Sequence, residues 1–193
     1  MQGMSDILSE PVVLEEACCA QPAIRDRSLS EGLAANAPYA GMAFLGALVF
    51  LTGLGWSAGA WAAGVAYVVA CALGAVWVMA FICPWCVYHG TRGCPCGYGM
   101  LAAKLRARAP CRGFARQFRR HIPVIAPLWL APAAFGVVWL ARGAGPAMVW
   151  PLAAFAVVAF VVLPLTSRAH SCGTCPQRDE CPWMGAQRDA GSQ

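Results

Sequence analysis

The chain has 193 residues, of which 59% are hydrophobic and only 12% are charged, and its formal net charge is +5. Soluble domains carry about 25% charged residues, and one soluble core of this size could not bury so much apolar surface. The composition therefore excludes an ordinary water-soluble domain and indicates a membrane protein. In such a protein, excess positive charge favours anionic lipid headgroups over nucleic acid as a partner.

Residues 1–38 are polar and contain the acids Glu15 and Glu16 and several prolines. A secretory signal peptide would need a basic start followed by a short apolar core, and this segment has neither. We therefore expect a mobile cytoplasmic N-terminal tail over residues 1–38.

Residues 39–82 predict a first transmembrane hairpin. No charged residue occurs from Gly32 to Thr91, and a bilayer core of about 30 Å needs roughly 20 helical residues. Small residues between Trp56 and Trp61 indicate the turn, because tryptophan favours the membrane–water interface. We expect helices at about 40–57 and 59–82, and the small residues Ala66, Ala70 and Gly74 predict close helix packing.

Residues 83–121 predict a cysteine-rich, basic cytoplasmic loop. The segment contains no acid and eight basic residues, namely Arg92, Lys104, Arg106, Arg108, Arg112, Arg116, Arg119 and Arg120. The positive-inside rule then places this loop and both termini in the cytoplasm of a protein of the inner (plasma) membrane. Apolar pairs among the arginines, with a break at Pro110, predict two short helices lying on the inner leaflet.

Residues 122–166 predict a second hairpin, with spans from Ile122 to Leu140 and from Ala147 to Thr166, and residues 167–193 a cysteine-rich cytoplasmic tail. The predicted fold is thus all-α, a polytopic membrane protein with four transmembrane helices in two hairpins. The spans contain no Asp, Glu, Lys or His, which transporters and proton pumps usually need along their path. We therefore expect the helices to act as packing elements.

Four cysteines in the loop follow helix two directly, as Cys83-Pro-Trp-Cys86 and Cys94-Pro-Cys96. Proline and glycine around them favour turns that let the chain fold back on itself. Cytosolic thiols are kept reduced, so closely spaced cysteines there indicate metal ligands more readily than structural disulfides. His89, between the two pairs, is an alternative ligand.

The tail carries a second group of candidate ligands, His170, Cys172, Cys175 and Cys181. Its three thiols need a fourth ligand, for which His170 is the local candidate and Cys111, Cys18 or Cys19 the remote ones. Cys-Pro steps are common where iron–sulfur clusters bind, whereas zinc favours regularly spaced pairs. The cofactor prediction is an iron–sulfur cluster, with zinc as the alternative. The pair Cys18-Cys19 is interpreted as a palmitoylation site or as having no chemical role.

The layout resembles that of membrane iron–sulfur subunits of quinol-dehydrogenating chains, the NapH-like family. The run Cys94-Pro-Cys-Gly-Tyr-Gly-Met-Leu101 is similar to the Cys-Pro loop of that family. The resemblance implies four helices, cytoplasmic termini and clusters beyond the last helix. The chain differs from the family in lacking a C-x3-C-P loop spacing and two complete four-cysteine ferredoxin motifs.

Three functions follow as hypotheses. The first is a membrane-anchored redox or electron-transfer protein with Cys-ligated centres at the cytoplasmic face, working with a membrane or cytoplasmic redox partner protein. The second is a membrane protein that handles or senses a soft metal such as Zn, Cu or Hg. The third is a membrane thiol–disulfide oxidoreductase, since Cys83-Pro-Trp-Cys86 has the spacing of redox-active pairs. The sequence identifies no catalytic residue.

A geometric expectation accompanies these hypotheses. Helices two and four each run inward and lead almost directly into a cysteine group, at Cys83 and at Cys172. If the hairpins pack as one bundle, both groups lie near its cytoplasmic end. The loop and tail cysteines should then approach one another and share a site, with His170 or Cys111 completing it.

Overall fold

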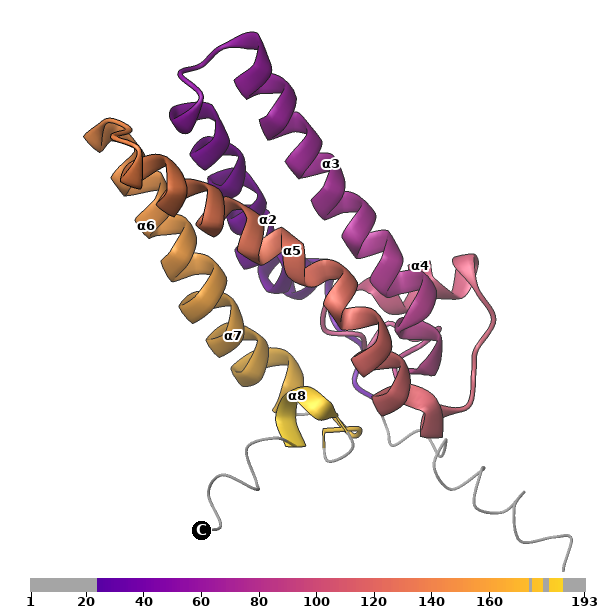
Figure 1. The fold of residues 1–193 in the computed structure, drawn as a ribbon. Helices are drawn as coiled ribbons and strands as arrows, with labels where there is room; N and C mark the ends of the chain where they lie inside the picture. The colour runs from indigo at the N-terminus through magenta and orange to yellow at the C-terminus, as the bar shows by residue number, and fades with distance from the viewer. Residues whose placement is uncertain (1–23, 174, 179–180, 186–193) are drawn as a thin grey trace, which may run out of the picture.

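The computed structural model describes residues 24–173, 175–178 and 181–185. Over these ranges the chain is all-helical, and four long helical rods form one bundle (Figure 1). The rods are α2 (Leu29–Gly53), α3 (Ala58–Phe81), α5 (Phe114–Ala141) and a fourth that runs from Pro146 to Cys172. Each is long and apolar enough to cross a membrane. The prediction of an all-α fold with four such helices is therefore confirmed.

α2 begins at Leu29, within the segment predicted as a tail and well before the expected helix start near residue 40. Ser28 and Glu31 form a capping box at this point. The Ser28 hydroxyl accepts a hydrogen bond from the Glu31 backbone N–H at 3.3 Å, and the Glu31 carboxylate accepts one from the Ser28 N–H at 2.8 Å. The box satisfies two N–H groups that lack partners inside the helix, and so it fixes the start.

The turn between α2 and α3 has left-handed backbone at Gly55 (φ +71°) and at Trp56 (φ +58°). The Trp56 N–H donates to the Leu51 carbonyl at 3.0 Å, and Ser57 caps α3 by accepting from the Ala60 N–H at 3.2 Å. This turn and the one between α5 and α6 lie at the same end of the bundle (Figure 1). The cysteine-bearing segments lie at the other end.

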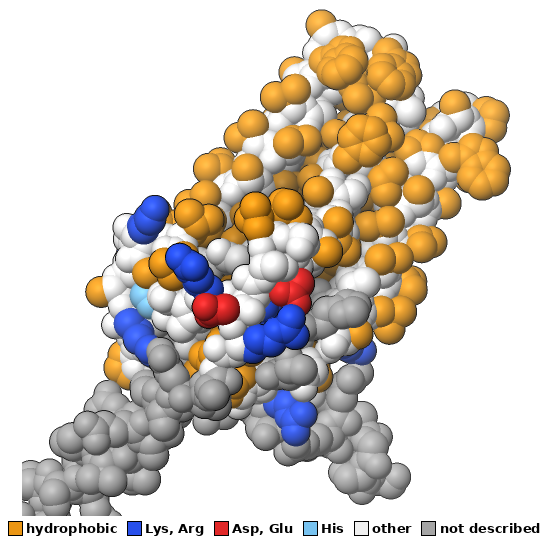
Figure 2. Space-filling model, turned by 180° about the vertical axis from the view of Figure 1, so that it is seen from behind, with side chains coloured by type: hydrophobic (Ala, Val, Ile, Leu, Met, Phe, Trp, Pro, Cys, Tyr) orange, Lys and Arg blue, Asp and Glu red, His pale blue; other side chains and the backbone are white. Residues whose placement is uncertain are grey.

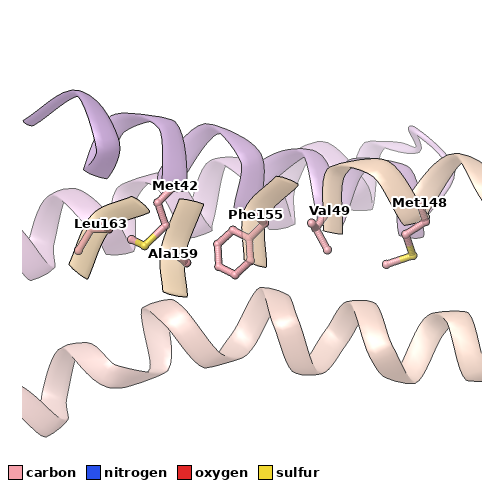
Figure 3. Close-up of a cluster of buried hydrophobic side chains, with 6 residues drawn as sticks. All are labelled: Met42, Val49, Met148, Phe155, Ala159 and Leu163. Carbon is pink, nitrogen blue, oxygen red and sulfur yellow. The ribbon is translucent and has the colours of Figure 1, made fainter. Parts of the chain in front are cut away.

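The core of the bundle lies between α2 and the fourth rod (Figure 3). Its fully buried side chains include Val49 of α2, and Met148 and Phe155 of the fourth rod. The cluster comprises Met42, Val49, Met148, Phe155, Ala159 and Leu163. α2 also packs against α3 and α5, and α3 packs against α5, so α2 is the central helix of the bundle.

Glycines mark the closest helix contacts. At Gly46 of α2 a side chain would collide with the ring of Tyr67, whose hydroxyl donates to the Leu128 carbonyl at 2.8 Å. At Gly74 of α3, a Cβ atom would lie 2.7 Å from a methyl carbon of Leu128 on α5. Of the predicted small-residue stripe, Gly74 is thus a packing point, whereas Ala66 lies on the exposed surface. Interhelical hydrogen bonds and the van der Waals packing that close approach allows are what hold helices together in lipid.

Most of the rod surface is apolar and exposed, including Leu73, Leu130 and Val137 at about 60% exposure. Figure 2 shows hydrophobic side chains covering the length of the bundle, with the charged side chains gathered at one end. An apolar surface of this extent would not be stable in water, and it suits contact with lipid chains. The structure is therefore that of a multi-pass membrane protein.

The segments between the rods differ from the expectation in one respect. α4 (Tyr98–Leu105) is a separate short helix, as predicted. The second expected surface helix, around Phe114 and Phe118, is instead the first part of α5.

The fourth rod is not a uniform α-helix, because α6 (Val149–Val157) and α7 (Leu163–Thr166) alternate with π-helical segments at Val158–Val162 and Ser167–Cys172. The helical path therefore reaches Cys172 without an extended linker.

Candidate metal centre

The first pair of loop cysteines lies in a tight turn that follows α3. Cys83–Trp85 form one turn of 3-10 helix, which Pro84 favours near its start because proline lacks the N–H that such a position leaves unpaired. The Cys86 N–H then donates to the Cys83 carbonyl at 3.0 Å, and the His89 N–H to the Cys86 carbonyl at 3.0 Å. Successive turns thus place both thiols at the end of the bundle.

The second pair, Cys94 and Cys96, lies in the turn that leads into α4. The Gly97 N–H donates to the Cys94 carbonyl at 3.0 Å, and Gly97 adopts φ +73°, a conformation that favours glycine. A Cβ atom on Gly99 would lie 2.7 Å from the Thr91 carbonyl oxygen. Two glycines therefore allow this loop to fold tightly on itself.

The chain that enters α2 lies against the loop. The Asn36 side chain donates to the Cys96 carbonyl at 2.9 Å, and the Arg27 N–H donates to the Arg92 carbonyl at 3.3 Å. Asn36 is partly buried, and its amide helps to hold the second cysteine pair in position.

The tail cysteines continue from the last π-helical segment. The Gly173 N–H donates to the Arg168 carbonyl at 2.9 Å, and the Cys175 N–H to the Cys172 carbonyl at 3.2 Å. The Cys181 N–H donates to the Arg178 carbonyl at 3.3 Å, just before α8 (Pro182–Gly185). The described residues of the tail therefore form short turns like those of the loop.

One side chain joins the tail to the loop. Gln177, 7% exposed, accepts a hydrogen bond from the Val87 N–H at 2.8 Å through Oε1. Its Nε2 donates to the Trp85 carbonyl at 3.4 Å. Val87 is itself 2% exposed, so the glutamine supplies the partner that a buried N–H requires. We call this pair of hydrogen bonds the Gln177 clasp. It brings the segments that carry the two cysteine groups together, as expected, whereas a site shared by their thiols stays a prediction.

Loop and tail thiols affect one another's pKa. Burial raises the pKa of the Cys86 thiol well above its usual range, and charge at Cys83, Cys175 and Cys94 raises it further. Burial likewise raises the pKa of Cys175, and the influence of Cys94 adds to it. Loop and tail thiols thus lie within electrostatic range of each other.

Cys96 of the loop and Cys172 of the tail are a second pair in which charge on one thiol affects the pKa of the other. Burial raises the pKa of Cys96 to about 12, and charge at Cys94 and Cys172 contributes. Burial raises the pKa of Cys172 to about 11, with smaller contributions from Cys181 and Cys175. Positive charge opposes these shifts, from Arg27 at Cys96 and from Arg168 at Cys172. Cys86, Cys96 and Cys172 are therefore protonated thiols at neutral pH unless a metal displaces the protons.

Across the described residues no three His, Cys, Asp or Glu side chains converge closely enough to hold a metal ion, and the nine described cysteines are free thiols. The predicted ligands Cys83, Cys86, Cys94, Cys96, Cys172, Cys175 and Cys181 are thus gathered at one end of the bundle without forming a closed ligand set. The side chain of His170 and the residues Cys18 and Cys19 lie outside the described part.

The remaining candidates have other surroundings. His89 is buried, and its Nε2 lies 3.1 Å from the Arg106 carbonyl oxygen. His121 stacks on Phe81 with ring centroids 5.0 Å apart. Cys111 is buried, with a guanidinium nitrogen of Arg108 at 3.9 Å from its sulfur. Cys71 lies within α3, away from the cysteine-rich end.

Sequence reasoning missed Gln177 and Asn36, the side chains that fasten the tail and α2 to the loop. A glutamine in a polar tail carries no signal of burial. Asn36 could have been suspected, because a capping box at Ser28 and Glu31 predicts that it lies inside a helix.

Comparison of the chain with protein-family models, with curated proteins and with solved structures found no match. The resemblance to NapH-like subunits thus depends on the layout and on the residues from Cys94 to Leu101 alone.

Proposed function

We propose that this is a membrane-anchored redox protein that holds a thiolate-ligated centre, an iron–sulfur cluster, at the cysteine-rich end of its helical bundle. The observation that carries the proposal is the meeting of two cysteine groups about 90 residues apart in the chain, fastened by the Gln177 clasp. Short turns with Cys-Pro steps present these thiols, and such steps are common at iron–sulfur sites.

The donor chemistry fits a thiophilic metal, since the seven candidate thiols are the soft ligands that iron–sulfur clusters and zinc prefer. A cluster supplies one-electron transfer when bound. Cys83, Cys86, Cys94 and Cys96 would supply one ligand set, and Cys172, Cys175 and Cys181 with His170 another. Because the described thiols are not convergent, binding would draw these side chains together from their positions in the structure.

The surroundings favour a negatively charged centre. Arg27 lies close enough to Cys96, and Arg168 close enough to Cys172, to stabilise their thiolates. Burial of these sulfurs strengthens such interactions, because the local dielectric is low. The basic segment 83–121 supports a cytoplasmic location for this end under the positive-inside rule, and a soluble or membrane redox protein would exchange electrons with it there.

Anaerobic purification tests the proposal, with iron and acid-labile sulfide determined per chain and the reduced protein examined by EPR. We expect stoichiometric iron and sulfide, and their loss when Cys86 and Cys94 are replaced by Ser. Cys71→Ala is the matched control, because Cys71 lies in the membrane span, and it should retain the full metal content. Colourless protein with stoichiometric zinc would overturn the iron–sulfur assignment.

A second candidate is the handling of a soft metal ion such as Zn(II), Cu(I) or Hg(II). It is favoured by the same free thiols, whose incomplete convergence suits capture and release more than permanent binding. Growth of a deletion strain under each ion separates the two candidates. Unchanged tolerance to all three ions would exclude this alternative.

The third candidate, a thiol–disulfide oxidoreductase, has less support than the first two. Reactive C-x-x-C pairs depend on a lowered thiol pKa, whereas burial raises that of Cys86. The observed environment stabilises the protonated, unreactive thiol, so thiol exchange is not part of the proposal.

A further inference from the structure

Eight basic side chains lie on the surface at the cysteine-rich end of the bundle. All are exposed, and they come from the loop, from α4 and from the first turns of α5: Arg92, Lys104, Arg106, Arg108, Arg112, Arg116, Arg119 and Arg120. We call this set the basic collar. Figure 2 shows basic side chains grouped at the end of the apolar shaft. The collar therefore lies where a membrane-spanning bundle would leave the lipid.

The positive charge of the collar is not balanced within the described protein. The ion pair in the described ranges joins Arg25 to Glu31, and no collar residue forms one there. Arg106 packs over the ring of Phe81, with 4.7 Å from its Cζ to the ring centroid, and so its charge lies at the end of α3. An uncompensated group of cations at this end of the bundle attracts a negatively charged partner from outside the protein.

The start of α5 gives a second, independent reason to expect an anion here. The N-terminus of a helix carries partial positive charge, and acidic residues usually compensate it. α5 has no acid in its first turn; exposed Arg112 lies just before the helix, and exposed Arg116 and Arg119 lie in its first two turns. Both the helix dipole and the side chains therefore attract an anion to this point.

α4 adds an apolar component beside these charges. The helix packs on the bundle through Gly99 and Ala102, which are buried. Its opposite side exposes Met100, Leu101 and Leu105, each close to half exposed, next to Lys104. An amphipathic helix of this kind lies in the headgroup region, with apolar side chains toward the acyl chains and cations toward the phosphates.

We infer that the basic collar and the apolar side of α4 bind anionic phospholipid of the surrounding leaflet, phosphate groups meeting the arginines and acyl chains meeting Leu101 and Leu105. The lipid is a partner of this end of the protein, independent of whether a metal centre is present. Phosphate recognition and apolar contact are both needed, which distinguishes lipid from a free phosphate.

The full chain in a neutral detergent tests this inference. Short-chain phosphatidylglycerol and phosphatidylcholine are titrated separately, and bound lipid is counted by native mass spectrometry. We expect tighter binding of phosphatidylglycerol and a loss of that preference in high salt. Neutralising Arg112, Arg116 and Arg119 to Gln should weaken binding about fivefold per residue, or roughly 100-fold in all. These three side chains make no packing contact like that of Arg106, so the variant should fold.

Two controls make the result decisive. Arg142→Gln removes an exposed arginine at the other end of the bundle and should leave phosphatidylglycerol binding unchanged. The double variant Leu101→Ser/Leu105→Ser keeps every charge and should weaken lipid binding without altering its salt dependence. Equal binding of the two lipids by the wild-type chain, or wild-type affinity in the triple arginine variant, would overturn the inference. Full displacement of phosphatidylglycerol by millimolar glycerol 3-phosphate would overturn it too, since a site for free phosphate explains that result.

Discussion

Replacing Gln177 by Ala should release the tail from the loop while leaving the helical bundle intact. The glutamine makes two hydrogen bonds to backbone groups of the loop, at 2.8 Å to the Val87 N–H and at 3.4 Å to the Trp85 carbonyl. Its removal leaves the Val87 N–H, on a residue only 2% exposed, without this partner. The four rods are held together by contacts elsewhere, so the effect should be local.

The magnitude follows from the burial of these groups. An unsatisfied buried polar group costs about 1–3 kcal/mol, and the longer bond to Trp85 adds little. We expect the closed arrangement to be destabilised by about 2 kcal/mol, which corresponds to a change of roughly 25-fold in the population of the open form. Gln177→Glu keeps the acceptor for Val87 but loses the donor to Trp85, so its effect should be measurable and distinct from that of Ala.

Hydrogen exchange of the metal-free protein in detergent measures this opening. The Val87 amide should exchange roughly 25-fold faster in Gln177→Ala, while amides in the middle of α3 keep their wild-type rates. Gln117→Ala on α5 is the matched control and should exchange as the wild type at both places. Unchanged exchange at Val87 in the Gln177 variant would refute the reasoning, because it would mean that the clasp does not hold the tail.

Two further predictions concern the loop and its thiols. Gly99→Ala should destabilise the cysteine loop by about 1–3 kcal/mol, because its Cβ would meet the rigid Thr91 carbonyl at 2.7 Å. Gly32→Ala on α2, which has open space around it, is the control and should be neutral or stabilising. Thermal unfolding followed by secondary- and tertiary-structure signals measures both variants, and equal stability of the two would contradict the packing. Burial raises the thiol pKa of Cys96 to about 12 and that of Cys172 to about 11. The metal-free fold therefore gains stability from the neutral forms of these thiols, in full below the unfolded pKa near 8.5. This contribution to stability is lost as the pH rises through 11 to 12. Maleimide at pH 8 should therefore react more slowly with the folded protein than with the SDS-denatured chain, and equal rates would disprove this.

The helices themselves were largely predictable from apolar length, since a charge-free run leaves few alternatives to membrane spans. The ends of these helices were less predictable. Asn36 and Pro38, both within α2, concealed a helix start that the Ser28 and Glu31 spacing encodes. The arginines before Ile122 suggested a separate surface helix, but a helix can carry exposed charges past the end of its apolar portion, and α5 does so.

The candidate site was predictable in composition and in approximate place. Cysteine spacing identified both groups, and the helix ends implied that the groups would meet. The contact itself depends on Gln177, which must be matched to a buried backbone N–H 90 residues away. No local pattern encodes such a pairing, because it arises only after the bundle has formed.

The same separation sets the order in which the cysteine-rich end can be completed during synthesis. Val87 is made directly after the first two rods, while Gln177 follows the last of the four. Until the second half of the chain has emerged and entered the membrane, the loop lacks the side chain that closes it. Closure of this end therefore waits for the second half of the chain, and a chain terminated before Gln177 would keep its loop cysteines and lose their closure.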